Sequence, residues 1–191
     1  MCGIAGLYAN LPLDRLDQEI RRMTDSLSHR GPDDVGYHLD RRIALGHRRL
    51  SIIDLTGGHQ PIFNEDRTRC IVFNGEIFNY RELRTELQAK GHHFSTQSDT
   101  ETILHAYEEW GEMALHRLRG MFAFCIWDAR EETLFLARDR FGIKPLFYAF
   151  DQGKFRFASE MKAILCDPDF KRDVDPEAIA SYFLFSYIPA P

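Results

Sequence analysis

The sequence predicts an α+β fold in which two antiparallel sheets pack together and are covered by helices. Short segments rich in β-branched and aromatic residues form two series, one before and one after a pair of helical segments. Polar turns separate neighbouring strands within each series, which is typical of antiparallel hairpins. The regular alternation of strand and helix that a parallel doubly wound sheet needs does not occur in the chain.

The composition favours a globular protein and excludes two classes of partner. The chain has 191 residues, of which 44% are hydrophobic, so it can bury a sizeable core as one domain, or as one domain and a fragment. Its net charge of -5, with scattered basic residues, predicts no nucleic-acid partner. Neither a segment of membrane-spanning length nor a signal peptide is recognisable, so we expect no membrane partner and a cytoplasmic location.

The first half of the chain begins with a short strand at 4–7. Apolar residues then recur at three- and four-residue steps over 13–27, which predicts an amphipathic helix that "HRGPDD" closes. Four strands are predicted next, in "VGYHLD", "RIALGH", "LSIID" and "RCIVFNGE".

Two capping boxes mark the central helices. Asn79 with Glu82 begins the first helix, and Gly91 can end it with a positive φ. Ser98 with Glu101 begins the second helix. The later strands follow in "MFAFCIWD", "TLFLARD", "PLFYAF" and "KFRFASE".

The C-terminal segment differs from the rest. Asp175 can cap a helix that Pro176 starts, and this helix carries an aromatic-rich face. Nothing downstream covers that face, so the segment looks cut from a longer protein.

Cysteine and histidine spacing predicts neither disulfides nor a metal site. The four cysteines lie far apart without a C-x-x-C pair, and Cys70 and Cys125 fall inside strand-like apolar runs typical of inert buried thiols. The eight histidines form no H-E-x-x-H motif and have no cysteine at ligand spacing. Only Cys2 lies where a reactive thiol is expected.

Removal of Met1 would leave Cys2 with a thiol and a free α-amino group on one residue. A free thiol titrates near about 8.5 and an α-amino group near about 7.7–8.0, so the amine can accept the thiol's proton near neutral pH. Cys2 is therefore a candidate N-terminal nucleophile that carries its own base.

An acyl group attacked by a thiolate develops an oxyanion that needs fixed donors. The side-chain amide of Asn74 and the backbone N–H of Gly75, in "FNGE", are candidates, and the missing Cβ of Gly75 would let a substrate approach closely. Asn-Gly is also the commonest hairpin turn, and on spacing alone the turn is the more frequent role.

Two charged residues are candidates for substrate binding. Arg49 can offer a planar fork to a carboxylate, and Asp99 can accept hydrogen bonds from an ammonium. Arg49 can equally be a solvated strand residue and Asp99 a helix cap, although Ser98 already supplies a cap. Arg30 in "HRGPDD" can contact the site or belong to a turn.

With these residues in view, the chain resembles the glutamine-hydrolysing domain of class II glutamine amidotransferases, most closely that of the asparagine synthetase family. The motifs that carry the resemblance occur in order along nearly the whole chain: "MCGIAG", "HRGPDD", "GHRRLSIID", "QPIFNE", "FNGEIFNYRELR", "SDTETILHAYEEWG", "LRGMFAFCIWD", "LARDRFGIKPLFY" and "FASEMKAIL".

The resemblance implies an N-terminal nucleophile hydrolase fold, a four-layer αββα sandwich. It also implies that Cys2 attacks the side-chain amide of L-glutamine to form a γ-glutamyl thioester, and that Asn74 and Gly75 form the oxyanion hole. Water would then release glutamate, and the alternative is a glutamine-binding regulatory module with little turnover in isolation.

The same resemblance implies the substrate contacts. The glutamine α-carboxylate would meet Arg49, its α-ammonium would meet Asp99 and Glu76, and backbone groups around Ile52 and Ile53 would line the pocket.

The resemblance further implies a glutaminase domain over 1–170, followed over 171–191 by a linker and the start of a truncated C-terminal synthetase domain. ATP and Mg²⁺ would serve only that missing domain, and none of the chemistry expected here needs a cofactor. An apolar face over 179–187 that is normally covered would favour a homodimer.

Overall fold

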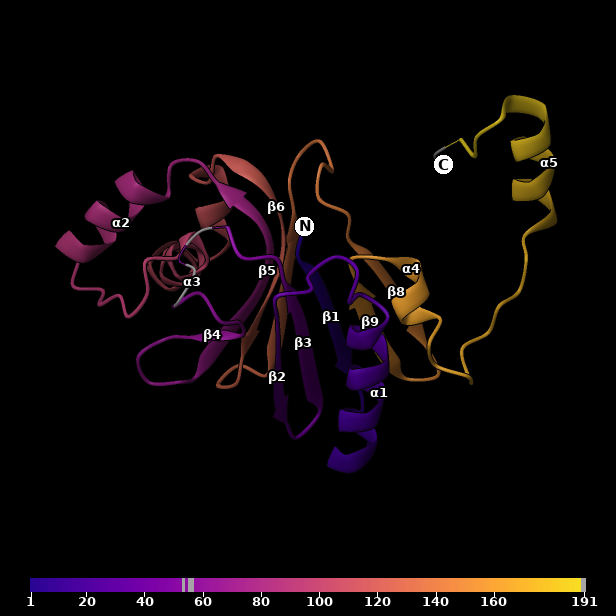
Figure 1. Ribbon diagram of the computed structural model, residues 1–191, viewed down its shortest axis with the longest axis horizontal. Helices are drawn as coiled ribbons and strands as arrows, with labels where there is room; N and C mark the ends of the chain where they lie inside the picture. The colour runs from indigo at the N-terminus through magenta and orange to yellow at the C-terminus, as the bar shows by residue number, and fades with distance from the viewer. Residues whose placement is uncertain (53, 55–56, 190–191) are drawn as a thin grey trace.

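Two antiparallel sheets lie face to face in the computed structural model, which describes residues 1–52, 54 and 57–189 (Figure 1). One sheet has five strands in the order β2-β3-β1-β9-β8, and the other has four in the order β4-β5-β6-β7. Every neighbouring pair of strands is antiparallel, as predicted. The strands are β1 (Gly3–Tyr8), β2 (Asp34–Asp40), β3 (Ile43–Arg49), β4 (Ile62–Phe63), β5 (Arg69–Ile77), β6 (Gly120–Asp128), β7 (Thr133–Arg138), β8 (Phe147–Asp151) and β9 (Lys154–Ala158).

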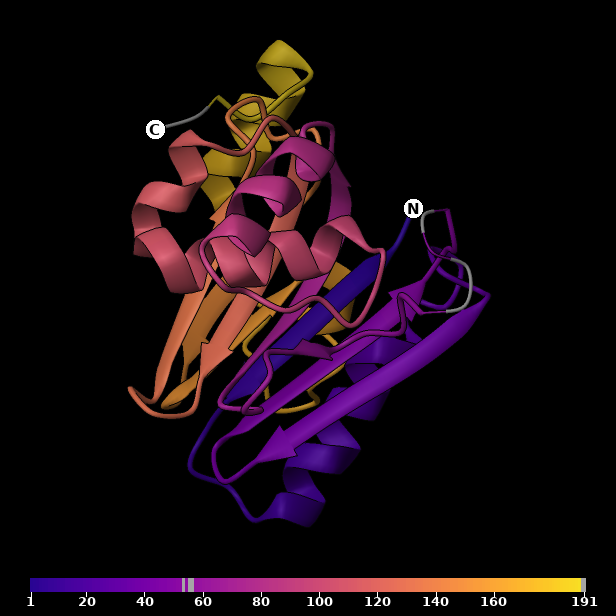
Figure 2. The ribbon, with the colours of Figure 1, turned by 90° about the vertical axis from the view of Figure 1, so that its left-hand side faces the viewer.

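Helices cover the outer face of each sheet and complete the four layers of an αββα sandwich. The five-stranded sheet is covered by α1 (Leu13–Asp25) and the short α4 (Met161–Ile164). The four-stranded sheet is covered by α3 (Asp99–Trp110), with α2 (Tyr80–Ala89) packed beside it. Figure 2 looks onto these two helices with the strands behind them. The predicted fold is therefore confirmed.

The core between the sheets comes from the two-residue periodicity of the strands. In β1, Ile4 points between the sheets, whereas Ala5 and Leu7 point toward α1. In β5, Cys70 and Val72 point between the sheets. Burial raises the pKa of Cys70 to about 12, in agreement with the predicted inert thiol.

The predicted strand in "LSIID" is wrong, because residues 50–52 and 54 lie in no strand. Side chains accept hydrogen bonds from the backbone N–H groups that a β-strand here would use to pair with a neighbouring strand. The N–H of Leu50 donates to the sulfur of Cys2, and the N–H of Ser51 donates to Asp33 Oδ2. The segment therefore crosses the end of the sheet as a loop. The two-residue strand β4, in "QPIFNE", was in turn not predicted.

The predicted capping boxes are corrected in part. Asn79 precedes α2, but its side chain makes no capping bond, because it bonds the backbone of Arg117 and Arg119 instead. Ser98 does cap α3 by accepting from Thr100 N–H. The carboxylate of Glu101, its expected partner in the capping box, instead accepts from the backbone N–H groups of Ser95 and Thr96, which precede the cap.

The final helix, α5 (Pro176–Phe185), begins as predicted, with Asp175 accepting from the N–H groups of Glu177 and Ala178. No residue of α5 is buried, and Figure 1 shows it apart from both sheets. Within the part of the chain that the structure describes, no helix is long and apolar enough to cross a bilayer. The domain boundary near residue 170 stays a prediction.

Truncating a side chain between the sheets should destabilise the whole fold. Leu45 on β3 is fully buried in this layer, so Leu45→Ala should lower the free energy of unfolding by about 2–5 kcal/mol. Denaturant unfolding measures the change. Leu13→Ala is the control, because Leu13 is 54% exposed and its truncation should cost less than about 0.5 kcal/mol. Equal losses in both variants would contradict this account of the core.

Candidate active site

A cavity of about 160 Å³ opens where the start of β1, the end of β3, the second half of β5 and the start of α3 meet. The pairing of Gly3 with Arg48 places the N-terminus beside the end of β3. Ile53 lies outside the described residues. The other site residues predicted from the sequence all line the cavity: Cys2, Arg49, Ile52, Asn74, Gly75, Glu76 and Asp99.

The thiol of Cys2 is held against the loop that follows β3. Its sulfur accepts from Leu50 N–H at 3.3 Å and donates to Leu50 O at 3.6 Å. Burial raises the pKa of the Cys2 thiol, although the Leu50 N–H and the positive charge of the chain terminus oppose this effect. The thiol is therefore protonated at neutral pH and needs a base before it can attack a substrate.

A buried arginine holds the backbone at Cys2. Arg30 Nε donates to the carbonyl of Cys2, and its Nη1 donates to Glu160 Oε1, both at 2.9 Å. Burial opposes ionisation of Glu160, but hydrogen bonds from Arg30, His29 and Lys162 outweigh it and lower the pKa of Glu160 to about 2. Of the two sequence-based alternatives for "HRGPDD", the structure therefore supports contact between Arg30 and the site.

Asn74 lies inside β5, paired with Ala123, and is not in a hairpin turn. Its side chain is 1% exposed, and Nδ2 has no hydrogen-bond partner among the described residues. A buried donor without a partner is costly in a folded protein. Because Asn74 lines the cavity with Cys2, a bound molecule can supply the missing acceptor.

The backbone N–H of Gly75 points to the same edge of β5 as those of Phe73 and Ile77, because N–H directions alternate along a strand. Phe73 N–H bonds Gln60 and Ile77 N–H bonds Asp99 at that edge, on the side away from β6. A Cβ at this position would lie 2.3 Å from Met121 O, so the missing side chain makes room for β6, a reason that the sequence did not predict. The close approach of a substrate to Gly75 stays a prediction.

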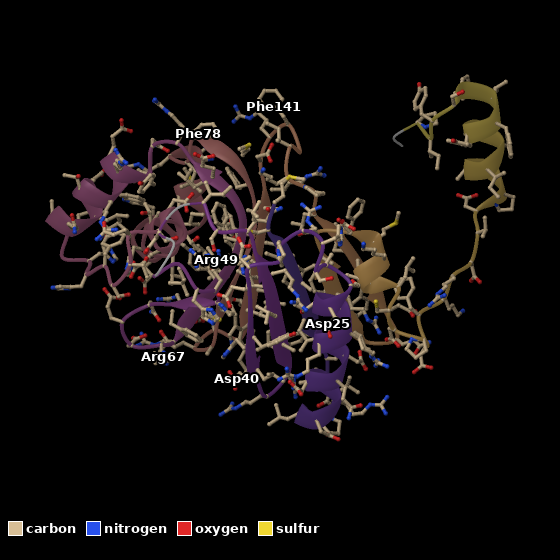
Figure 3. The ribbon with its side chains drawn as sticks, in the orientation of Figure 1. Asp25, Asp40, Arg49, Arg67, Phe78 and Phe141 are labelled. Atoms are coloured by element: carbon tan, nitrogen blue, oxygen red, sulfur yellow. The ribbon has the colours of Figure 1, made fainter. Side chains whose placement is uncertain are left out.

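Arg49, at the end of β3, is 6% exposed and is not a solvated strand residue. Figure 3 shows it near the middle of the molecule, where the two sheets meet. Its Nη2 donates to Asp54 O at 2.5 Å. A Cβ on Gly58 would lie 2.4 Å from that nitrogen, so the loop after β3 packs directly on the guanidinium.

Asp99 is the first residue of α3, and Ser98 takes the capping role beside it. Asp99 is 4% exposed, and its Oδ2 accepts from Ile77 N–H at 3.0 Å. Burial raises the pKa of Asp99 to about 6, and the negative charge of Glu76 adds to this shift. A cationic ligand in the cavity would favour the ionised carboxylate.

Four polar residues that line the cavity were not predicted as site residues from the sequence, namely Gln60, Ser98, Thr100 and Lys144. Ser98 and Thr100 flank Asp99 at the start of α3. Gln60 precedes a cis-proline, and Lys144 follows the turn after β7, so neither falls on a periodic element that would reveal its direction. Both are more than nine-tenths buried, and both line the cavity with Cys2. The backbone N–H of Lys144 donates to Asp139 Oδ2, which anchors the loop that carries it.

A second group of titratable side chains lies away from the cavity. Glu65, His92 and His105 have potential metal-ligand atoms within 4.8 Å of one another, an arrangement that the spacing in the sequence does not predict. Burial lowers the pKa of His105, but the nearby carboxylates outweigh it and raise the pKa to about 9: Glu101 lies 3.8 Å from Nε2, and Glu108 accepts from Nδ1 at 2.8 Å. A buried histidinium between carboxylates accounts for this group as an ion-pair network.

Comparison with known proteins identifies the family of the chain. The family model described as a glutamine amidotransferase domain matches residues 1–191. The chain is 47% identical over 194 residues to the glutamine-hydrolysing asparagine synthetase 1 of Bacillus subtilis (strain 168), covering 100% of this chain and 30% of that protein. It is 44% identical over 169 residues to the glutamine-hydrolysing asparagine synthetase 2 of Arabidopsis thaliana, covering 87% and 29%.

A solved structure shares the fold. The glutamine phosphoribosylpyrophosphate amidotransferase of B. subtilis, complexed with ADP and GMP, superposes with a TM-score of 0.72 at 23% identity, over 86% of this chain and 43% of that one. This chain spans about 30% of the length of the asparagine synthetases that it matches. Because the family match runs from residue 1 to residue 191 and the relatives agree with it, the chain belongs to the glutamine amidotransferase domain family, in the branch found in asparagine synthetases.

Proposed function

We propose that this domain hydrolyses the side-chain amide of L-glutamine to give L-glutamate and ammonia, with Cys2 as the nucleophile. The observation that carries the proposal is the shared cavity, in which the partly buried thiol of Cys2 lies with Asn74 Nδ2, a donor without a partner among the described residues. The relatives, which are named as glutamine-hydrolysing enzymes, support the same substrate. Met1 lines the cavity, so its removal would both free the amine and enlarge the space beside the thiol.

In the proposed mechanism the α-amine of Cys2 takes the thiol's proton, and the thiolate attacks the amide carbon. A carbon–sulfur bond forms, and the negative charge moves to the oxygen, where Asn74 Nδ2 and Gly75 N–H stabilise it. The carbon–nitrogen bond then breaks, the ammonium of Cys2 returns the proton to the leaving nitrogen, and a γ-glutamyl thioester remains. Water, deprotonated by the same amine, attacks the thioester and releases glutamate and the thiol.

The charged end of glutamine is proposed to bind at the opposite side of the cavity from the reacting amide. Arg49 would bind the α-carboxylate through its planar fork, and Asp99 with Glu76 would bind the α-ammonium. The backbone beside Ile52 would line this part of the pocket, and the role of Ile53 stays a prediction. The carboxylates of Asp99 and Glu76 would offset the cost of placing the positive charge of the substrate ammonium in a buried cavity.

We also propose that ammonia passes to a C-terminal synthetase domain, which would use ATP and Mg²⁺. The support is that the matched asparagine synthetases are about three times as long as this chain, which covers 30% of the B. subtilis protein. Exposed apolar side chains lie at the end of the molecule above Arg49, where Phe78 is 64% and Phe141 is 86% exposed (Figure 3). A domain docked there would cover these exposed side chains.

Replacing the nucleophile should abolish glutamine hydrolysis. Cys2→Ala should lower glutamate release by at least about 1,000-fold, because the remaining groups cannot form the covalent intermediate. Intact mass first establishes that Met1 is absent from each preparation. Cys166→Ala is the matched control, since Cys166 is also partly exposed but lies outside the cavity. Equal rates in Cys2→Ala and the parent would refute the proposal, and saturable binding without release by the parent would favour a regulatory glutamine-binding module.

The proposed ammonium contact makes glutamine binding dependent on pH. The pKa of Asp99 is raised to about 6, so the carboxylate is ionised above pH 6 and neutral below it. The KM for glutamine should therefore rise as pH falls, approaching tenfold per pH unit well below 6. Steady-state kinetics from pH 5 to 8 measure this acid limb. In Asp99→Asn the KM should be high and nearly constant over that range, and an unchanged acid limb in this variant would exclude the contact.

A further inference from the structure

The edge of β5 beside the cavity is bounded by side chains and not by a neighbouring strand. The pairing of β4 with β5 covers only Cys70 and Ile71, so residues 73–77 face no strand on that side within the described part of the chain. Gln60 Oε1 accepts from Phe73 N–H at 2.7 Å, and Asp99 Oδ2 accepts from Ile77 N–H at 3.0 Å. The N–H of Gly75 lies between these two and faces the cavity.

Gln60 connects the two elements that carry the proposed substrate contacts. Its side chain is buried, and Nε2 donates to Thr100 Oγ1 at 3.3 Å while Oε1 holds Phe73. Phe73 directly precedes Asn74 in β5, and Thr100 directly follows Asp99 in α3. One amide side chain therefore bridges the strand and the helix at Phe73, while the bond from Ile77 N–H to Asp99 holds the start of the helix independently.

A buried side chain also holds the carbonyl of Phe73. His47, on β3 of the other sheet, lies 3.1 Å from Phe73 O through Nε2, and its ring is 1% exposed. Burial lowers the pKa of His47 to about 4, so the neutral ring donates its Nε2–H to the carbonyl. Both backbone polar groups of Phe73 are thus fixed by buried side chains from outside its own sheet.

We propose that Gln60 is a positioning residue for amide hydrolysis, which orients the backbone at Phe73 so that Asn74 Nδ2 and Gly75 N–H converge on the oxyanion. The inference rests on the proposed function and extends it to a residue that does not itself react. Oxyanion donors act mainly in the transition state, so a change in their direction should lower kcat more than it changes KM.

Gln60→Met tests the inference, because methionine has a similar length but neither the acceptor nor the donor. In preparations that lack Met1, kcat for glutamine should fall by about 10- to 100-fold, less than the 10²–10³-fold typical of deleting a donor outright. The KM should change by less than about threefold, since Arg49 and Asp99 are retained. Gln88→Met, on the exposed face of α2, is the matched control and should match the parent.

A second readout separates positioning from a general collapse of the site. Alkylation of Cys2 by iodoacetamide needs the thiol but forms no oxyanion, so its rate should stay within about twofold of the parent in Gln60→Met. Gln60→Asn, whose shorter side chain cannot span both partners, should show the same pattern and serves if Gln60→Met does not fold. In the double variant with Asn74→Ala the two losses should be less than additive, because both act on one group of donors.

Two outcomes would overturn the inference alone, and a third would instead refute the proposed function on which it rests. An unchanged kcat in Gln60→Met, or in Gln60→Asn, would remove the positioning role while glutamine hydrolysis stands. Parallel losses of kcat and alkylation rate would show that Gln60 only maintains the fold. Full activity in Cys2→Ala, or no glutamate release by the parent once Met1 is removed, would refute the proposed function itself.

Discussion

The antiparallel pairing of β1 with β3 is the constraint on which the rest of the site depends. It brings the first residues of the chain to the end of a central strand, so that the thiol of Cys2 bonds both backbone groups of Leu50. Arg30 then holds the carbonyl of Cys2 from the end of the α1 segment. A chain terminus normally frays, and here it is fixed on both sides.

The two sheets have different parts in the cavity. The five-stranded sheet supplies the thiol and Arg49, and the four-stranded sheet with its helix supplies Asn74, Gly75 and Asp99. The apolar layer between the sheets therefore holds Cys2 and Arg49 opposite the cavity residues of the other sheet. Asn74 lines the cavity between these two groups of residues, and its Nδ2 has no partner among the described residues.

Burial also controls the charges of the site. It raises the pKa values of both Cys2 and Asp99, so the resting cavity keeps its thiol neutral and its carboxylate close to titration at neutral pH. An ammonium in the cavity would offset the cost at Asp99, because it favours the ionised carboxylate. The zwitterionic substrate proposed above would therefore stabilise charges that burial disfavours in the empty site.

The local sequence determined most elements, the order of the two strand series and the class of fold, since periodicity and turn residues act over a few positions. It also indicated Cys2 as a candidate reactive residue, because a thiol directly after the initiator methionine is unusual whatever the tertiary structure. The tertiary structure decided what short-range patterns cannot: that Asn74 lies in a strand and not a turn, that residues 50–52 and 54 lie in no strand, and that Gln60 reaches Phe73 and Thr100. These outcomes depend on partners tens of residues away, whose contacts replace the local hydrogen bonds that the patterns assume.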